Sequence, residues 1–175
     1  NISLELNVDA ISRFKITNKI FIDGFSDDVI VIYTGPLDSL FSYCYGSLPY
    51  RSLRFEWVHE DVDDFQPYPV VAYPQEPLFT RITDYSKLPV QKGKGTSYAI
   101  EYPLPVADGV EPYYPVINED SVKRYELYAS LADSIGNLYY CGRLANFKYY
   151  NMDEALRCAL NMVSRIVKDL DMVDI

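Results

Sequence analysis

Histidine and cysteine are scarce, which narrows the chemistry open to this chain. The only histidine is His59. One histidine excludes a multi-histidine metal site, and a Ser-His-Asp triad would depend on a residue with no motif around it. We therefore expect no metal, and we expect His59 to be an ordinary strand or loop residue. The three cysteines, Cys44, Cys141 and Cys158, lack C-x-x-C spacing, so they predict neither a disulfide framework nor a zinc site and favour a reducing cytoplasm.

Long apolar runs and an excess of positive charge are also missing. The longest apolar run, Val29 to Tyr33, is far below the ~20 residues that a membrane helix needs, and no signal-peptide pattern opens the chain. Lysine and arginine number 16 against 25 aspartates and glutamates, a net charge of -9 that repels phosphate backbones. We expect a soluble, cytoplasmic protein that binds neither nucleic acid nor a membrane, although a local basic pocket could hold one small anion.

A glycine-rich phosphate-binding loop is absent as well. Gly93-Lys94-Gly95 is followed by Tyr98, where a G-x-G-x-x-G fingerprint needs a small residue. We interpret this glycine pair as the tip of a hairpin.

The composition and pattern predict an α+β fold. With 175 residues, 49% of them hydrophobic, the chain can enclose a core as one domain or two small lobes. From Tyr50 to Tyr102, segments of period two are separated by turns, which is typical of an antiparallel sheet. Val29 to Tyr33 is apolar on both faces, as in strands inside a parallel sheet. The expected strands are Ser3–Leu6, Lys19–Ile22, Asp28–Tyr33, Ser52–His59, Pro69–Tyr73, Thr80–Asp84, Thr96–Tyr102 and Asn137–Cys141.

Two helices are expected in the last third of the chain. The first runs from about Ser121 to Asp133. The second begins after Asn151, where Glu154 completes a capping-box-like start. Its apolar residues at helical spacing are Ala155, Leu156, Ala159, Leu160, Val163, Ile166, Val167 and Leu170.

Tyrosine is abundant, with 17 residues, and several tyrosines lie beside arginines. Arginine presents a fixed fork of donors that suits phosphate, while a tyrosine hydroxyl can donate to a phosphate oxygen as its ring packs on a sugar or base. The combination favours a diphosphate or nucleotide-sugar site. Composition alone leaves open the other interpretation, in which the tyrosines simply cover a half-buried sheet.

The order of several motifs resembles the carboxy-terminal half of UDP-galactopyranose mutases. The resemblance runs from about Val29 to the final helix with the family's approximate spacing, whereas residues 1–28 fit less distinctively. The motifs are Val31-Ile32-Tyr33-Thr34-Gly35-Pro36-Leu37-Asp38, Tyr50-Arg51-Ser52-Leu53-Arg54-Phe55-Glu56, Phe79-Thr80-Arg81-Ile82, Glu101-Tyr102-Pro103, Glu111-Pro112-Tyr113-Tyr114-Pro115-Val116, Gly142-Arg143-Leu144-Ala145, and Lys148-Tyr149-Tyr150 with Met152.

The resemblance implies a flavin-binding lobe built from two separated chain pieces, and an antiparallel sheet that faces the substrate. Residues 1–47 and 136–175 would be remnants of the flavin lobe, and 48–135 the sheet lobe with one helix. The family's Gly-rich loop, which holds the diphosphate of FAD, would lie in a missing amino-terminal segment. We therefore expect the chain alone to hold no FAD and to be inactive, and its exposed docking surface could drive a homodimer.

The resemblance also implies the reaction, which interconverts UDP-galactopyranose and UDP-galactofuranose for surface polysaccharide biosynthesis. Reduced FAD attacks the anomeric carbon, and no net oxidation occurs. The protein's task is to orient the sugar and to stabilise the departing diphosphate.

Substrate-binding residues follow from the same resemblance. Arg81 would be the diphosphate clamp, with Tyr114 and Tyr149 donating hydroxyls to the same phosphates. Arg51 would be a second positive group, and Glu101 would hold the array in position. Each also has an ordinary structural interpretation, as a solvent-facing strand residue or a packing aromatic.

The closing loop would meet the flavin through Gly142 and Arg143, and it carries two departures from the family pattern. Asn151, also assigned to the substrate site, stands where the family usually has an aspartate. Asparagine caps a helix as well as aspartate does, but the lost charge puts rate or sugar specificity in question. Cys141 replaces a glycine and could crowd the loop.

Two other functions remain open at this point. A stand-alone nucleotide-sugar binding module would bind UDP without any effect of flavin. A fragment of a related flavin oxidoreductase would bleach oxidised flavin when given its substrate.

Overall fold

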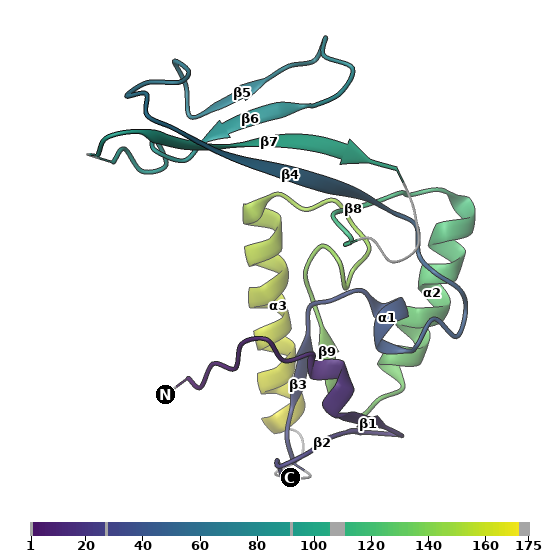
Figure 1. The fold of residues 1–175 in the computed structure, drawn as a ribbon. Coiled ribbons are helices and arrows are strands. Elements are labelled where there is room, and N and C mark those ends of the chain that lie inside the picture. Colours follow the sequence, from purple (N-terminus) through teal and green to yellow (C-terminus); the bar gives the residue numbers. More distant parts are fainter. Residues whose placement is uncertain (1, 27, 92, 106–110, 172–175) are drawn as a thin grey trace. The chain divides into compact units, whose positions relative to one another are not determined.

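The computed structural model describes residues 2–26, 28–91, 93–105 and 111–171 (Figure 1). The chain divides into two compact units. We call Asn1–Pro49 with Pro115–Ile175 the α/β unit, and Tyr50–Tyr114 the sheet unit. Each is described by itself below.

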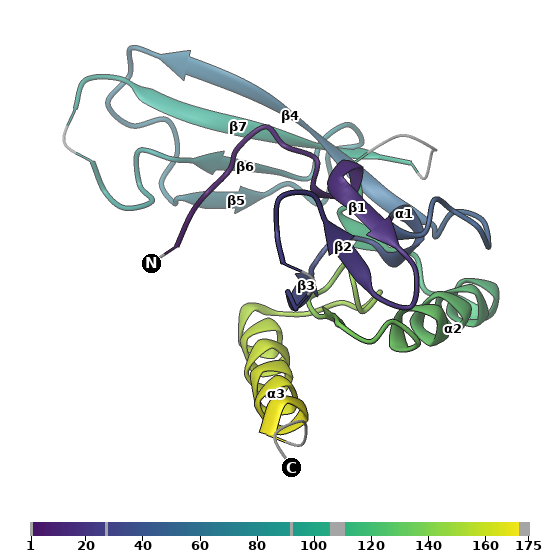
Figure 2. The same cartoon turned by 90° about the horizontal axis from the view of Figure 1, so that it is seen from below.

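Within its described residues, the α/β unit contains two small sheets and three α-helices. A short 3-10 helix leads into an antiparallel hairpin, and β3 pairs in parallel with β9, with Val31 opposite Leu138. Both α2 and α3 pack against β9, while α1 packs against α2 (Figures 1 and 2). The elements are η1 (Ala10–Arg13), β1 (Phe14–Ile16), β2 (Ile20–Ile22), β3 (Val31–Tyr33), α1 (Leu37–Leu40), α2 (Glu119–Asp133), β9 (Leu138–Tyr140) and α3 (Met152–Asp171).

Buried polar groups join the pieces of this unit. The side chain of Asn137 accepts a hydrogen bond from Ile20 N (2.7 Å) and donates to Ile20 O (2.8 Å) and Val29 O (2.9 Å), so it ties the hairpin to the segment before β3. Tyr128 of α2 is fully buried, and its hydroxyl accepts from Tyr45 N (2.8 Å) and donates to Gly46 O (2.9 Å). Such satisfied buried groups specify one arrangement of the chain.

The Tyr-Thr-Gly-Pro-Leu-Asp motif forms the turn between β3 and α1. The Tyr33 hydroxyl donates to Pro36 O at 3.1 Å, folding the ring back over Gly35. A Cβ on Gly35 would lie 2.5 Å from that hydroxyl oxygen, so a larger residue there would force the Tyr33 ring to move. Asp38 is buried and its Oδ2 accepts from Leu48 N at 2.8 Å, which fixes the chain after α1.

The sheet unit is built on five strands in the order β5-β6-β7-β4-β8. They are β4 (Tyr50–Glu60), β5 (Val70–Ala72), β6 (Arg81–Asp84), β7 (Thr96–Leu104) and β8 (Tyr114–Pro115), whose last residue already belongs to the α/β unit. The pairs β5–β6, β6–β7 and β7–β4 are all antiparallel. The predicted antiparallel sheet is therefore confirmed.

One face of this sheet carries a small core. Ile82 and Tyr98 are buried on it, and Phe65, from the loop after β4, stacks on the Tyr98 ring with centroids 3.9 Å apart. The Tyr98 hydroxyl donates to Glu60 Oε1 at 2.7 Å. Burial, followed by the Glu60 contact, raises the pKa of Tyr98 to about 12, so this tyrosine stays neutral and serves the core.

Several sequence expectations need correction. Ser3–Leu6 is not a strand, because no strand within the described residues pairs with it. The expected sheet lobe at 48–135 included the first long helix, whereas α2 belongs to the α/β unit, because its buried face contacts α1 and β9. The four-residue helix α1 was not expected. The other expected strands and both long helices form where they were predicted, with shifted ends, whereas β1 and β8 were not expected.

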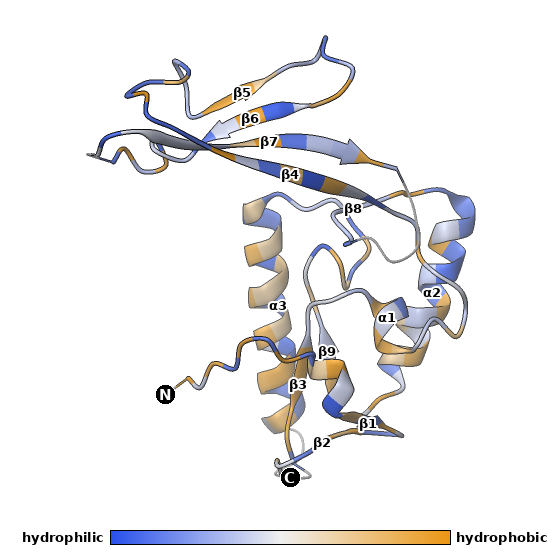
Figure 3. Cartoon of the chain, viewed as in Figure 1, coloured by the Kyte–Doolittle hydropathy of each residue, from blue (hydrophilic) through white to orange (hydrophobic). Residues whose placement is uncertain are grey.

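The final helix exposes its apolar face. Leu160 and Val163 are 59% and 53% exposed, although their spacing predicts a buried stripe. Figure 3 colours much of α3 as hydrophobic. The stripe, which we call the α3 stripe, consists of Met152, Leu156, Leu160, Val163, Val167 and Leu170.

Candidate functional site

The register of the sheet brings three of the predicted substrate residues to one face. Arg81 lies opposite Glu101, and Glu101 lies opposite Phe55 on the next strand. Directly opposed residues share a face, and alternate residues along a strand return to it. Arg51, four residues before Phe55 on β4, therefore shares the face with Arg81 and Glu101. We call it the clamp face.

Arg81 and Glu101 form the best-defined contact on the clamp face. Arg81 Nε donates to Glu101 Oε1 at 3.0 Å. The Glu101 residue is 8% exposed, whereas the Arg81 side chain is 42% exposed. A buried carboxylate thus holds a guanidinium that reaches solvent. Binding through Nε leaves the two Nη groups of the fork as the outward donors.

A threonine holds the same carboxylate, which sequence reasoning did not single out. Thr80 Oγ1 donates to Glu101 Oε1 at 3.0 Å, and Thr80 N donates to Glu101 O at 2.9 Å. Thr80 lies inside the Phe-Thr-Arg-Ile motif. Its proximity to Arg81 in the sequence was the available signal, but its contact with Glu101 depends on the pairing of β6 with β7.

Arg51 lies farther along the same face. Four residues of extended chain span about 13 Å, so Arg51 is not an immediate neighbour of the Arg81–Glu101 pair. It lies next to β8 instead, because Tyr113 N donates to Arg51 O at 3.1 Å. The sheet therefore places Arg51 beside the segment that carries Tyr114, at the β4–β8 edge.

An aromatic row on the clamp face was also missed. Trp57, the only tryptophan, is 65% exposed and stacks on Tyr85 with centroids 5.2 Å apart. Phe55 lies 6.5 Å from Trp57 and 5.9 Å from Tyr113, again between centroids. The period-two pattern of β4 already placed Phe55 and Trp57 on the face of Arg51, and that pattern could have revealed the row.

The loop between β9 and α3 carries the other predicted site residues, Gly142, Arg143, Tyr149 and Asn151. Gly142 has φ +104°, a conformation that favours glycine, and a Cβ there would meet no atom within 4 Å. The loop closes through Asn146 N to Gly142 O (2.9 Å) and Lys148 N to Arg143 O (3.0 Å). Its shape is thus set by the backbone, with open space beside Gly142.

Buried residues anchor this loop from beneath. Phe147 is 3% exposed and stacks on Tyr125 of α2 with centroids 5.7 Å apart. Burial raises the pKa of Tyr125 to about 12, so it packs as a neutral ring. Cys141 is buried, and burial raises the pKa of its thiol.

The end of the loop starts α3 with the predicted cap. Glu154 Oε2 accepts a hydrogen bond from Asn151 N at 2.8 Å, which confirms the reciprocal half of the capping box. Asn151 and Tyr149 are exposed. Gly142, Arg143, Tyr149 and Asn151 therefore belong to one short segment whose fold is fixed by Asn146, Phe147 and the helix start.

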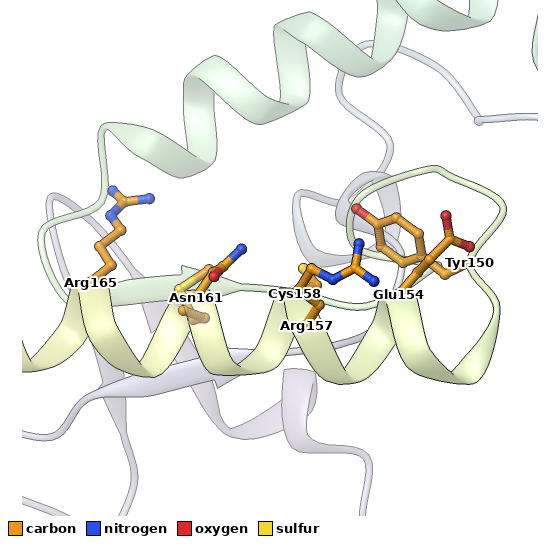
Figure 4. Close-up of a pocket in the computed structure, with 7 residues that line it drawn as sticks. Tyr150, Glu154, Arg157, Cys158, Asn161 and Arg165 are labelled. Carbon is orange, nitrogen blue, oxygen red and sulfur yellow. The ribbon is translucent and has the colours of Figure 1, made fainter.

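A hollow of about 380 Å³ lies along α3 (Figure 4). Helical periodicity places its lining on the side of α3 opposite the α3 stripe. The lining residues are Tyr150, Glu154, Arg157, Cys158, Asn161, Met162 and Arg165. The arginines already have acidic neighbours one turn away, Asp153 and Asp169. None of the predicted site residues lines the hollow.

The chemistry of these groups suits an anion. Among the described residues, no group of three or more His, Cys, Asp or Glu side chains could hold a metal ion. A membrane-crossing helix, long and apolar enough to span a bilayer, is likewise not found in the described part of the chain. A braced arginine on an open sheet face can orient and neutralise a phosphate group.

Comparisons with known proteins agree with the motif order. A sequence profile of UDP-galactopyranose mutases matches residues 1–149. The UDP-galactopyranose mutase of Mycoplasma pneumoniae is 37% identical over 145 residues, covering 79% of this chain and 36% of that protein. A probable UDP-galactopyranose mutase of Klebsiella pneumoniae is 32% identical over 179 residues, covering 98% of this chain and 44% of that protein.

A relative with another sugar nucleotide in its name is also similar. The dTDP-fucopyranose mutase of Escherichia coli is 32% identical over 135 residues, covering 74% of this chain and 36% of that protein. The chain therefore spans less than half the length of the curated relatives that it matches.

Proposed function

The chain belongs to the UDP-galactopyranose mutase family, and we propose that it forms the diphosphate-clamping part of a flavin-dependent mutase that interconverts UDP-galactopyranose and UDP-galactofuranose. The product would serve surface polysaccharide biosynthesis. The relatives' names support the mutase reaction. The observation that carries the assignment of the site is the Arg81–Glu101 contact on the clamp face.

Arg81 suits the role of diphosphate clamp. When the sugar leaves the nucleotide, negative charge grows on the diphosphate, and a pre-oriented cation stabilises that charge. Glu101 holds Nε at 3.0 Å and so fixes the plane of the guanidinium before a ligand arrives. The Nη groups can then bind two oxygens of one phosphate. Arg51, Tyr114 and Tyr149 would contribute further donors in the assembled site.

The β9–α3 loop is proposed to lie against FAD. Gly142 leaves open space where a side chain would otherwise project, and Arg143 follows it on a loop fixed by Phe147. These residues fit the approach of a flat ring system to the backbone. Reduced FAD, when bound, would supply the nucleophile for the anomeric carbon. The residues of this chain would hold the ring, orient the sugar and neutralise the diphosphate.

The rest of the flavin lobe is proposed to come from the portion of the relatives that this chain does not span. Two observations support this assembly. The α3 stripe is exposed, and β3 is buried on one side only, with Val31 6% and Ile32 52% exposed. Parallel strands are normally covered on both faces. We propose that residues 1–47 and 136–175 contribute to that lobe, and that the chain alone holds no FAD.

Replacing Arg81 tests the clamp. In the protein made from the complete reading frame, Arg81→Ala should lower kcat/KM for UDP-galactopyranose at least about 100-fold, the order lost when one charge-stabilising donor is removed. Flavin content should stay unchanged, because Arg81 lies in the sheet unit and the proposed flavin contacts lie in the α/β unit.

Arg54→Ala is the matched control for this experiment. Arg54 lies on the same strand as Arg51 but faces the opposite side of the sheet, where it covers the Tyr102 ring at 3.9 Å from the centroid. Its loss should leave turnover within about twofold of wild type, since it is a solvent-exposed residue away from the clamp face. Full turnover by Arg81→Ala would refute the assignment of Arg81. Assaying dTDP-fucopyranose in parallel would decide between the two sugar nucleotides named among the relatives.

A further inference from the structure

We propose that Thr80 is a positioning residue for the clamp: its hydroxyl holds the Glu101 carboxylate in the one rotamer that fixes Arg81. This inference rests on the proposed function of Arg81. It adds a residue whose side chain contacts Glu101 and acts through it, and it gives that contact a measurable consequence for ligand affinity.

One carboxylate oxygen is the meeting point of the three side chains. Glu101 Oε1 accepts from Thr80 Oγ1 at 3.0 Å and from Arg81 Nε at 3.0 Å. Thr80 Oγ1 also lies 3.2 Å from Glu101 O, so the hydroxyl bridges the backbone and the carboxylate of the same residue. That bridge fixes the carboxylate relative to its own strand.

The bridge matters because a glutamate side chain can adopt several rotamers, and only one of them places the carboxylate against Arg81. Ordering such a side chain costs conformational entropy, and a second hydrogen bond to the same oxygen offsets part of that cost. Without the hydroxyl, the remaining hydrogen bond to the Glu101 carboxylate among the described residues would be that of Arg81. Arg81 has a long side chain that is 42% exposed. Glu101 and Arg81 would then each depend on the other to stay ordered, whereas the Thr80 hydroxyl anchors Glu101 to the chain just before β6.

The structural role of Thr80 can be separated from its positioning role. The backbone of Thr80 already joins β7, since its N–H donates to Glu101 O at 2.9 Å. Valine keeps that backbone bond and nearly the same shape, and it removes only the hydroxyl. Serine restores the hydroxyl without the methyl group. The pair Thr80→Val and Thr80→Ser therefore isolates the hydrogen bond to Glu101.

Thr83→Val is the matched control. Thr83 lies on β6 two residues after Arg81, on the same face of the sheet, where it opposes Ala99 and not Glu101. The same chemical change at Thr83 should alter neither Arg81 nor ligand affinity. Unfolding temperatures of all variants would identify any general loss of structure.

Two measurements on the protein made from its complete reading frame test the proposal. Exchange of the Arg81 Nε proton with water, followed by NMR with labelled arginine, reports the Arg81–Glu101 bond without any ligand. Calorimetry with UDP reports the clamp. Thr80→Val should speed the exchange and weaken UDP binding roughly fivefold to tenfold, which lies within the range for losing one ordinary hydrogen bond. Thr80→Ser should restore both values, and Thr83→Val should change neither.

The outcomes separate this proposal from the proposed function. Unchanged proton exchange in Thr80→Val would overturn the positioning role. Faster exchange with unchanged UDP affinity would overturn it too, because the ordering of Arg81 would then serve no binding. If the wild-type protein binds no UDP, the diphosphate clamp itself fails, and the exchange measurement still decides whether Thr80 orders Arg81.

Discussion

At the scale of single residues, the sheet unit depends on a buried carboxylate in β6, the strand that begins with Arg81. Asp84, the last residue of β6, has a fully buried side chain. Its Oδ1 accepts from Ser86 Oγ (2.6 Å), Thr96 Oγ1 (2.7 Å) and Ser86 N (3.0 Å). Burial by itself raises the pKa of Asp84, but these hydrogen bonds and the nearby Lys87 outweigh it, so the pKa lies below its usual value.

Asp84→Asn tests this balance through pH. Because the folded pKa is lowered, the stabilisation by Asp84 is fully present above the unfolded pKa of about 3.9 and is lost as the pH falls through the folded value. The variant should lose about 1–3 kcal/mol of unfolding free energy at pH 7. Below about pH 4, the unfolding free energy of the variant should also decline less steeply than that of the wild type.

Denaturant unfolding from pH 3 to pH 7, followed by the fluorescence of Trp57, measures both effects. Asp61→Asn is the matched control, because Asp61 is exposed and should change neither the free energy nor its pH dependence. A wild-type pH profile in Asp84→Asn would show that the carboxylate is not stabilised in its charged form.

At the scale of elements, α3 shows what a sequence pattern can and cannot predict. Its helical period and its start at Asn151 and Glu154 were both readable, because they depend on neighbouring residues. The direction of its apolar face was not, because exposure of the α3 stripe depends on which surfaces the rest of the chain provides. The same limit explains Ser3–Leu6, whose alternation predicts a strand only if another strand lies beside it.

The sheet strands were predicted more completely than the short elements. Period two in β4 and β7 fixes which side chains share a face, so Arg51, Phe55 and Trp57 could be grouped from the sequence. The Thr80–Glu101 contact could not, since it depends on the register between β6 and β7. Helix α1 has four residues, too few for a helical period to be visible.

The exposure of α3 leads to a prediction at the same scale. Leu160→Gln with Val163→Gln should reduce self-association of this chain, because it removes two apolar side chains from the centre of the α3 stripe. The stability of the chain should stay within about 1 kcal/mol of wild type, since both residues are more than half exposed. In the protein from the complete reading frame, the same change should lower stability and flavin content.

Sedimentation measures the association, and absorbance measures the flavin. Lys168→Gln, on the polar side of the same helix, is the control and should leave both unchanged. If the double variant had no effect on the complete protein, the α3 stripe would not be a covered surface there.

At the scale of the whole molecule, the division into two units separates the clamp from the proposed flavin loop. Arg81, Glu101 and Thr80 lie in the sheet unit, whereas Gly142 and Arg143, the proposed flavin contacts, lie in the α/β unit. A diphosphate clamp can therefore be preformed without cofactor, while the flavin contacts depend on completing the α/β unit. The 175-residue chain should therefore bind UDP without FAD, whereas the product of the complete reading frame should bind both.

That separation gives the last prediction. The 175-residue chain should retain no FAD on purification, because the α3 stripe and Ile32 are exposed and its sequence contains no G-x-G-x-x-G loop to hold a dinucleotide diphosphate. The product of the complete reading frame, read from the coding DNA around this segment, should retain FAD and convert UDP-galactopyranose only after reduction. Flavin absorbance and the mutase assay on both proteins test this. Stoichiometric FAD on the 175-residue chain would refute the proposal that flavin binding needs the rest of the relatives' length. If both proteins bound UDP and neither retained flavin, a cofactor-free binding module would be favoured.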